Sequence, residues 1–310
     1  MRRVKTCLLL ATVAVVSGGC HGTGVTGTTV VPTAERPVVK EATREELLDA
    51  YNQIARNTRT LNATVELKPT AGSRYSGVID EYHEVKAFLL AERPAEIRVI
   101  GQAPVIGTTV FDMASDGEAF RVSVPSKNKF LVGPVGLERS SSKPIENLRP
   151  QHLLDALLWP EIRKEEAVTL KEFNDEKARY YVLTVLRGGY QVEVLREIWF
   201  DRADLHVARM ETFGPKGTLL SDVSLGDWEP LNNASAQTTT AQAVAPQVTP
   251  TVTSFPRAIR IDRPHDDYKL DLQVTKITVN DEIPAERFKL EQPAGAELVR
   301  VGEAPESKPQ

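Results

Sequence analysis

Between residues 43 and 67 the spacing of apolar residues changes from a helical to an extended period. Thr43 and Glu46 fit a capping box at the start of a helix. The apolar stripe that follows consists of Leu47, Leu48, Tyr51, Ile54 and Ala55. This spacing predicts an amphipathic helix over about 43–59. From Leu61 to Leu67 apolar and polar residues alternate, which predicts a half-buried strand.

Short apolar runs separated by turn residues fill most of the remaining chain. The first group comprises 75–90, 96–101, 107–114, 118–124 and 129–133. The second group comprises 166–173, 178–187, 190–200, 206–213, 218–228, 257–263 and 268–279. Asp116-Gly117 is a typical hairpin turn. Strands at this spacing predict an antiparallel sheet.

A second helix is predicted between the two groups of strands. The segment Asn147-Leu148-Arg149-Pro150 leads into it, and Pro160 ends it. Its apolar side consists of Leu153, Leu154, Leu157, Leu158 and Trp159. With the first helix, it makes the predicted fold class α+β and mostly β.

Residues 232–253 contain no charged and no aromatic side chain, and they predict a disordered insertion. Because the strand pattern resumes after them, we expect one domain over 43–301 that the insertion interrupts. The tail 302–310 is also expected to be disordered.

The first 20 residues have the composition of a secretory signal. Arg2, Arg3 and Lys5 precede an apolar stretch that is too short to span a bilayer, and Gly18-Gly19-Cys20 follows. A signal that ends in cysteine resembles a bacterial lipoprotein signal. That resemblance implies removal of 1–19, acylation of Cys20, and a flexible lipidated tether over 20–42. The alternative is an ordinary secretory signal that leaves Cys20 as a free thiol.

The amino-acid composition limits the kinds of site and partner that the mature chain can have. The other cysteine, Cys7, lies inside the signal, so the mature chain has no intramolecular disulfide and no cysteine-based metal site. Removal of the three basic residues changes the formal net charge from −4 to −7, which disfavours a nucleic-acid partner.

No catalytic motif is present, and we expect neither an enzyme nor a cofactor. The five histidines have no metal-type spacing, and no serine elbow or phosphate-binding glycine loop occurs. Asp80 to Glu84 predict a solvated strand face, and Arg263 to Asp267 predict a turn. A catalytic site assembled from residues distant in sequence would carry no such motif.

The order of elements and several short motifs are similar to those of LolA and LolB, the bacterial lipoprotein carrier and its membrane-bound acceptor. The motifs are Asp116-Gly117-Glu118-Ala119-Phe120, Val124-Pro125-Ser126, Val279-Asn280-Asp281-Glu282-Ile283-Pro284, Phe288-Lys289-Leu290 and Pro293-Ala294-Gly295-Ala296. The resemblance covers roughly 43–300. It implies an antiparallel unclosed β-barrel of about ten to twelve strands, with helices covering its concave face.

The resemblance also implies an apolar hollow for acyl chains beneath the helices. Candidate lining residues are Phe88, Leu90, Ile100, Val110, Phe111, Leu154, Leu157, Leu158 and Trp159. The alternative for each of them is simple core packing. For the acceptor's protruding apolar loop, the nearest candidate is 132–137.

We therefore expect a membrane-anchored periplasmic protein that binds or transfers a lipid or lipoprotein without covalent chemistry. The alternative is a structural lipoprotein that docks envelope proteins. A continuous apolar hollow would favour transfer, and a filled core would favour docking. His21, in place of an aspartate after the cysteine, favours the outer membrane over the inner membrane.

Overall fold

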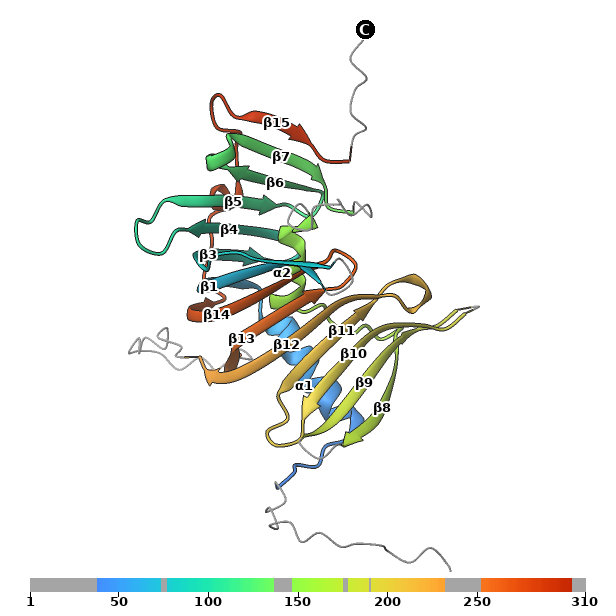
Figure 1. The fold of residues 1–310 in the computed structure, drawn as a ribbon. Helices are drawn as coiled ribbons and strands as arrows, with labels where there is room; N and C mark the ends of the chain where they lie inside the picture. Colours follow the sequence, from blue (N-terminus) through green and yellow to red (C-terminus); the bar gives the residue numbers. More distant parts are fainter. Residues whose placement is uncertain are drawn as a thin grey trace, which may run out of the picture. The chain divides into compact units, whose positions relative to one another are not determined.

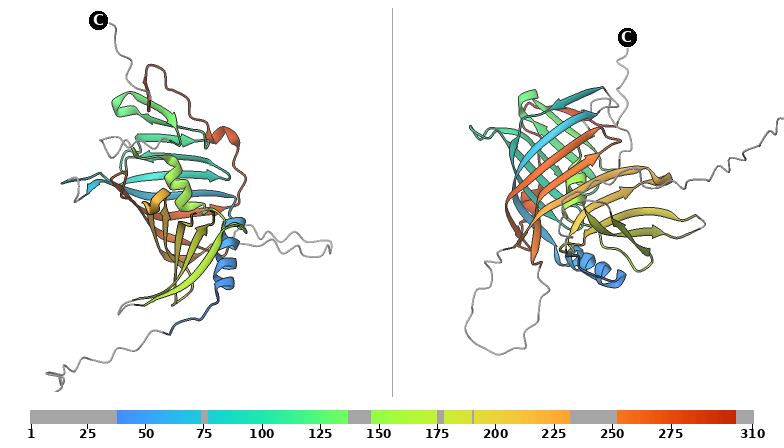
Figure 2. Two further views of the ribbon diagram at one scale, coloured as in Figure 1. Left: turned by 90° about the vertical axis from the view of Figure 1, so that its right-hand side faces the viewer. Right: turned by 60° about the horizontal axis from the view of Figure 1, so that its bottom comes forward.

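A computed structural model describes residues 38–73, 77–136, 147–174, 178–189, 191–231 and 252–302. These residues belong to one compact unit, Val38–Gln310, and Cys20 lies outside them. The described part contains two α-helices and one sheet of 15 strands (Figure 1). The sheet curves so that both helices lie on its concave face (Figure 2).

Both predicted helices are present. Helix α1 spans Arg44–Asn57, and the predicted capping box of Thr43 and Glu46 is formed. Helix α2 spans Pro150–Leu157 and has Pro150 in its first turn. Short 3-10 helices lie at η1 (Pro125–Lys127), η3 (Pro215–Gly217) and η4 (Ala285–Phe288).

The strands follow the chain in two groups. Before α2 they are β1 (Thr60–Ser73), β2 (Val78–Glu81), β3 (Val85–Glu92), β4 (Glu96–Gln102), β5 (Thr109–Ser115), β6 (Ala119–Val124) and β7 (Lys129–Pro134). After α2 they are β8 (Ala167–Asn174), β9 (Arg179–Arg187), β10 (Glu193–Asp201), β11 (Val207–Phe213), β12 (Leu219–Pro230), β13 (Ser254–Arg263), β14 (Tyr268–Val279) and β15 (Glu297–Arg300).

The sheet does not close into a barrel. Its order is β15-β7-β6-β5-β4-β3-β1-β14-β13-β12-β11-β10-β9-β8, with β2 paired to β1. All neighbours are antiparallel except β15, which runs parallel to β7. The unclosed antiparallel fold is therefore confirmed. The expected number of strands was too low, partly because the predicted run 75–90 divides into two strands and the mostly exposed β15 has no alternating pattern.

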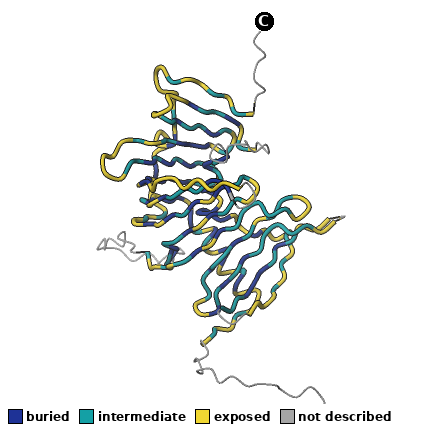
Figure 3. Tube along the Cα trace, viewed as in Figure 1, coloured by how far each residue is buried: buried dark blue, intermediate teal, exposed yellow. Residues whose placement is uncertain are grey.

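The two faces of the sheet differ in polarity. In β3, Val85, Ala87 and Leu89 are buried, while Lys86 and Phe88 between them are exposed. Figure 3 shows the same change from buried to exposed positions along other strands. The buried residues of the inner face join those of α1 and α2 in one apolar cluster. Burial of this cluster is the main source of stability.

The strands on either side of the predicted insertion lie next to each other, because β12 pairs with β13. Residues 232–251 lie outside the described part. The end of the predicted insertion belongs to the fold, since Val252 is buried and the Thr253 carbonyl accepts a hydrogen bond from Leu231 N at 2.9 Å. Val252 and Thr253 are therefore among the described residues.

Candidate functional site

The helical cover over the concave face is built from two short amphipathic helices. Helix α2 packs against β4 and β5, and α1 packs against β9. The buried side of α1 includes Leu47 and Tyr51, and that of α2 includes Leu153, Leu154 and Leu157. Their helical spacing places these residues on one face of each helix, toward the sheet.

A row of aromatic rings runs beneath the cover. The rings of Tyr51 and Trp159 stack with their centroids 5.6 Å apart. Trp159 meets Trp228 of β12 edge to face at 6.1 Å, and Trp228 stacks on His206 at 4.6 Å. Such ring pairs add stability beyond their buried area. The row connects α1 with the strands of the second group.

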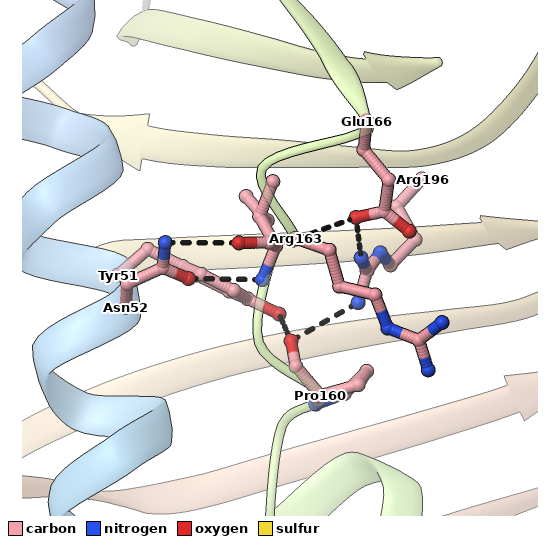
Figure 4. Close-up of polar contacts among 7 residues, drawn as sticks. Tyr51, Asn52, Pro160, Arg163, Glu166 and Arg196 are labelled. Carbon is pink, nitrogen blue, oxygen red and sulfur yellow. Dashed lines mark hydrogen bonds and ion pairs between the residues drawn. The ribbon is translucent and has the colours of Figure 1, made fainter. Parts of the chain in front are cut away.

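Residues 159–163, which we call the strap, follow α2 and fasten it to α1. Asn52 Nδ2 donates to the Ile162 carbonyl at 3.2 Å, and Ile162 N donates to Asn52 Oδ1 at 2.9 Å. Tyr51 Oη donates to the Pro160 carbonyl at 3.0 Å (Figure 4). Burial raises the pKa of Tyr51 to about 12, so this hydroxyl remains a donor at neutral pH.

The strap is also fastened to the sheet. Arg196 Nη1 of β10 donates to the Pro160 carbonyl at 3.0 Å, and its Nη2 lies 3.1 Å from Glu166 Oε2. The same Glu166 oxygen accepts from Arg163 N at 2.9 Å (Figure 4). The Arg196 and Glu166 side chains are only 11% and 14% exposed, so solvent screens their ion pair weakly.

A third connection holds the N-terminal end of α2. His152 Nδ1 and Tyr268 Oη of β14 form a hydrogen bond, and the two rings stack with centroids 6.1 Å apart. Burial lowers the pKa of His152 well below its usual value, and the nearby cations Arg263 and Arg149 lower it further. His152 is therefore neutral at pH 7, with Nδ1 able to accept from Tyr268.

Five of the nine predicted lining residues lie on the inner face. Leu154, Leu157, Leu158 and Trp159 are between 2% and 4% exposed and belong to the apolar cluster. Phe111 of β5 packs against the same cluster. The space between cover and sheet is thus occupied at these positions by the protein's own side chains.

The other four predicted lining residues are on the opposite face, which corrects that part of the prediction. Phe88 pairs with Ile100, and both alternate with the buried inner-face residues of their strands. Val110 is exposed next to the inner-face Phe111. Leu90 is buried on the outer face, in a small cluster with Ile283 and Phe288. Because β3 carries apolar residues on both of its faces, its sequence did not reveal which side chains face the helices.

Two hollows are found among the described residues. One, of about 450 Å³, crosses β1, β14, β13 and β12 on the outer face and is lined by charged groups such as Lys68 and Asp271. The second, of about 530 Å³, lies between α1 and the turn that joins β10 to β11. None of the predicted lining residues borders either hollow.

The turn between β4 and β5 carries an exposed apolar tip. Val105 is 94% exposed and Ile106 is 77% exposed. The predicted protruding loop, 132–137, is wrong: its first residues belong to β7, whose Val132 pairs with Arg121 of β6. Leu137 lies outside the described residues. The apolar tip escaped prediction because Val105 and Ile106 resemble the start of a strand.

Two classes of site are not found within the described ranges. No helix there is both long and apolar enough to cross a bilayer. No group of three or more histidine, cysteine, aspartate or glutamate side chains there is placed to hold a metal ion.

Comparison with known proteins gives only distant likenesses. No family model matches the chain, and no curated protein matches it. The chain is similar in structure to a LolA superfamily protein from Nitrosomonas europaea, with a TM-score of 0.45 and 12% identity over 81% of this chain and 99% of that one. It is also similar to a DUF1329 family protein from Desulfovibrio piger, with a TM-score of 0.49 and 11% identity over 78% and 94% of the chains.

A third similar structure is a domain assigned to an outer membrane lipoprotein-sorting protein from Vibrio parahaemolyticus, with a TM-score of 0.42 and 12% identity over 78% and 95% of the chains. These likenesses concern the fold alone.

Proposed function

We propose that this protein binds the acyl chains of a lipid or lipoprotein between the inner face of its sheet and the helical cover, and passes them on without covalent chemistry. The observation that carries the proposal is that the apolar and the polar contacts of the cover lie in different segments. Helix α2 buries four leucine and alanine side chains on the sheet, whereas many of the cover's polar fastenings are concentrated in the strap.

Because of this separation, an acyl chain can replace α2 on the sheet while the strap stays in place. Apolar contacts between α2 and the sheet can be replaced by contacts of similar area with an acyl chain, at little cost in hydrophobic free energy. The strap's hydrogen bonds are directional, so they return the cover to one position when the ligand leaves. Acyl binding would therefore move α2 while the polar fastenings hold the strap to α1 and β10.

The exposed tip at Val105 and Ile106 suits the same function, because an apolar turn can enter the headgroup region of a bilayer. In this proposal an acylated Cys20 holds the protein on the periplasmic side of the outer membrane, and the tip touches the bilayer from which cargo is taken or to which it is delivered.

The packed state of the inner face favours a second candidate. With Leu154, Leu157, Leu158 and Trp159 almost fully buried, the fold has the filled core expected of a structural lipoprotein that docks envelope proteins. In that case the cover never opens, and its polar fastenings serve stability alone.

Native mass spectrometry of the mature chain, exported with an ordinary signal peptide and Cys20→Ala, separates the two candidates. Acyl transfer predicts a protein that carries an acyl lipid from the cell or binds an added diacylglyceryl lipopeptide. Phe88→Glu on the outer face should leave that adduct unchanged, whereas Leu157→Glu beneath the cover should abolish it. A mass that stays free of lipid under all these conditions would support the structural candidate.

A further inference from the structure

The hollow beside α1 brings together three side chains with complementary chemistry. Asp204 and His206 belong to the turn between β10 and β11, and Ser254 is the first residue of β13. Asp204 Oδ2 lies 2.9 Å from His206 Nδ1, and His206 Nε2 lies 3.4 Å from Ser254 Oγ. Carboxylate, imidazole and hydroxyl are thus arranged in the order that activates a serine nucleophile.

The imidazole is held from two sides. Its ring stacks on Trp228 at 4.6 Å with only 6° between the planes. Asp204 Oδ1 accepts a hydrogen bond from His206 N at 2.8 Å, which fixes the carboxylate beside the ring. Nδ1 lies close to the Asp204 carboxylate, but the two atoms do not form a hydrogen bond in this structure. Catalytic hydrogen bonds are often misaligned in this way before substrate binds.

The negative charge of Asp204 favours one tautomer of the His206 imidazole. Burial raises the pKa of this carboxyl, but hydrogen bonds from His206 outweigh that effect and leave the pKa below its usual value. An ionised Asp204 favours a proton on His206 Nδ1. His206 Nε2 is then free to accept the hydroxyl proton of Ser254.

The backbone at this turn is strained. Leu205, between Asp204 and His206, has a φ of 69°, in the left-handed region that a branched side chain rarely occupies. Strained backbone conformations of this kind concentrate at functional sites. Asp204, Leu205 and His206 all line the hollow.

The walls of the hollow suit a small ester. Apolar surface comes from Ala50, Ile54, Leu205 and Val252, which are able to contact an acyl chain. The α1 wall adds the polar residues Gln53, Arg56 and Asn57. A volume of about 530 Å³ accommodates a short or medium acyl group, which is the substrate class that the site would accept.

We propose that this hollow is a serine esterase site with Ser254 as nucleophile and His206 as general base. Ser254 Oγ forms a bond to the ester carbonyl carbon while its proton passes to His206 Nε2. The C–O bond to the alcohol breaks, and the alcohol leaves with that proton. Water then attacks the acyl-serine, again giving a proton to His206, and releases a carboxylic acid and free Ser254. This site adjoins the row of aromatic rings, because His206 stacks on Trp228, and it adds hydrolysis to the lipid binding proposed above.

A fluorophosphonate probe tests the site on the full mature protein, because it forms a covalent bond only with an activated serine. We expect one equivalent of probe on the protein, and peptide mass mapping should place it on Ser254. Hydrolysis of p-nitrophenyl butyrate should be detectable and should stop when the probe has reacted. Because mapping uses the unaltered chain, this result does not depend on how any variant folds.

Two variants with matched controls complete the test. Ser254→Ala should lose labelling and turnover, whereas Ser224→Ala on the outer face should keep both. His206→Gln should slow turnover by about 10²- to 10⁴-fold, whereas His265→Gln in the exposed β13–β14 turn should not. An unlabelled wild-type protein, label on another residue, or turnover that persists in Ser254→Ala would each overturn the proposal.

Discussion

His152 shows how a single side chain makes the cover sensitive to pH. It must stay neutral to accept the hydrogen bond from Tyr268, and the charged groups nearest to it include the cations Arg149 and Arg263. Protonation of His152 therefore opposes the docking of α2.

The lowered pKa of His152 gives the direction of this effect. The unfolded state binds the proton at a pKa of 6.5, whereas the folded state binds it only at lower pH. The stability that His152 contributes is thus fully present above pH 6.5 and is lost as pH falls below it. We expect the free energy of unfolding to fall on acidification from pH 7, as measured by urea denaturation.

His152→Gln supplies the control for this prediction. Glutamine retains an acceptor for Tyr268 but does not titrate, so the fall in stability below pH 6.5 should shrink. His265→Gln removes an exposed histidine and should leave the wild-type pH profile unchanged. An identical profile in all three proteins would mean that His152 does not control the docking of α2.

At the scale of elements, the contact between α1 and the strap is a separate test of how the cover is fastened. Asn52→Ala removes both hydrogen bonds to Ile162 and leaves a buried N–H and a buried carbonyl without partners. The expected loss is about 1–3 kcal/mol in the free energy of unfolding, with an unchanged denaturant slope. Asp49→Ala, on the exposed side of α1, should change stability by about 0.5 kcal/mol or less. Equal effects would show that the strap is not a fastening point.

The helices and most strands could be predicted because their signals are local. The capping box at Thr43 and the two prolines around α2 each depend on residues a few positions apart. The outward direction of Phe88 could not be predicted, since both faces of β3 are apolar. The strap and the Asp204–His206–Ser254 cluster were missed because their members come together only through the tertiary fold.

At the scale of the molecule, the unclosed sheet separates two environments. Its inner face forms one apolar cluster with the cover, whereas its outer face carries ion pairs such as Arg98 with Asp112 and Arg260 with Asp271. An acyl chain is compatible only with the first environment, because burial of charged groups beneath it would be costly. The central claim is therefore that lipid enters between cover and sheet.

The three tryptophans allow this claim to be measured directly. Trp159 and Trp228 pack with the inner cluster, and Trp199 lies on the outer face beside Arg209. A nitroxide on an acyl chain quenches tryptophan only at short range. With nitroxide-labelled stearate, the Trp199→Phe variant should lose fluorescence, and the Trp159→Phe/Trp228→Phe variant should not. Quenching of Trp199 alone, or of no tryptophan at saturating stearate, would contradict lipid binding beneath the cover.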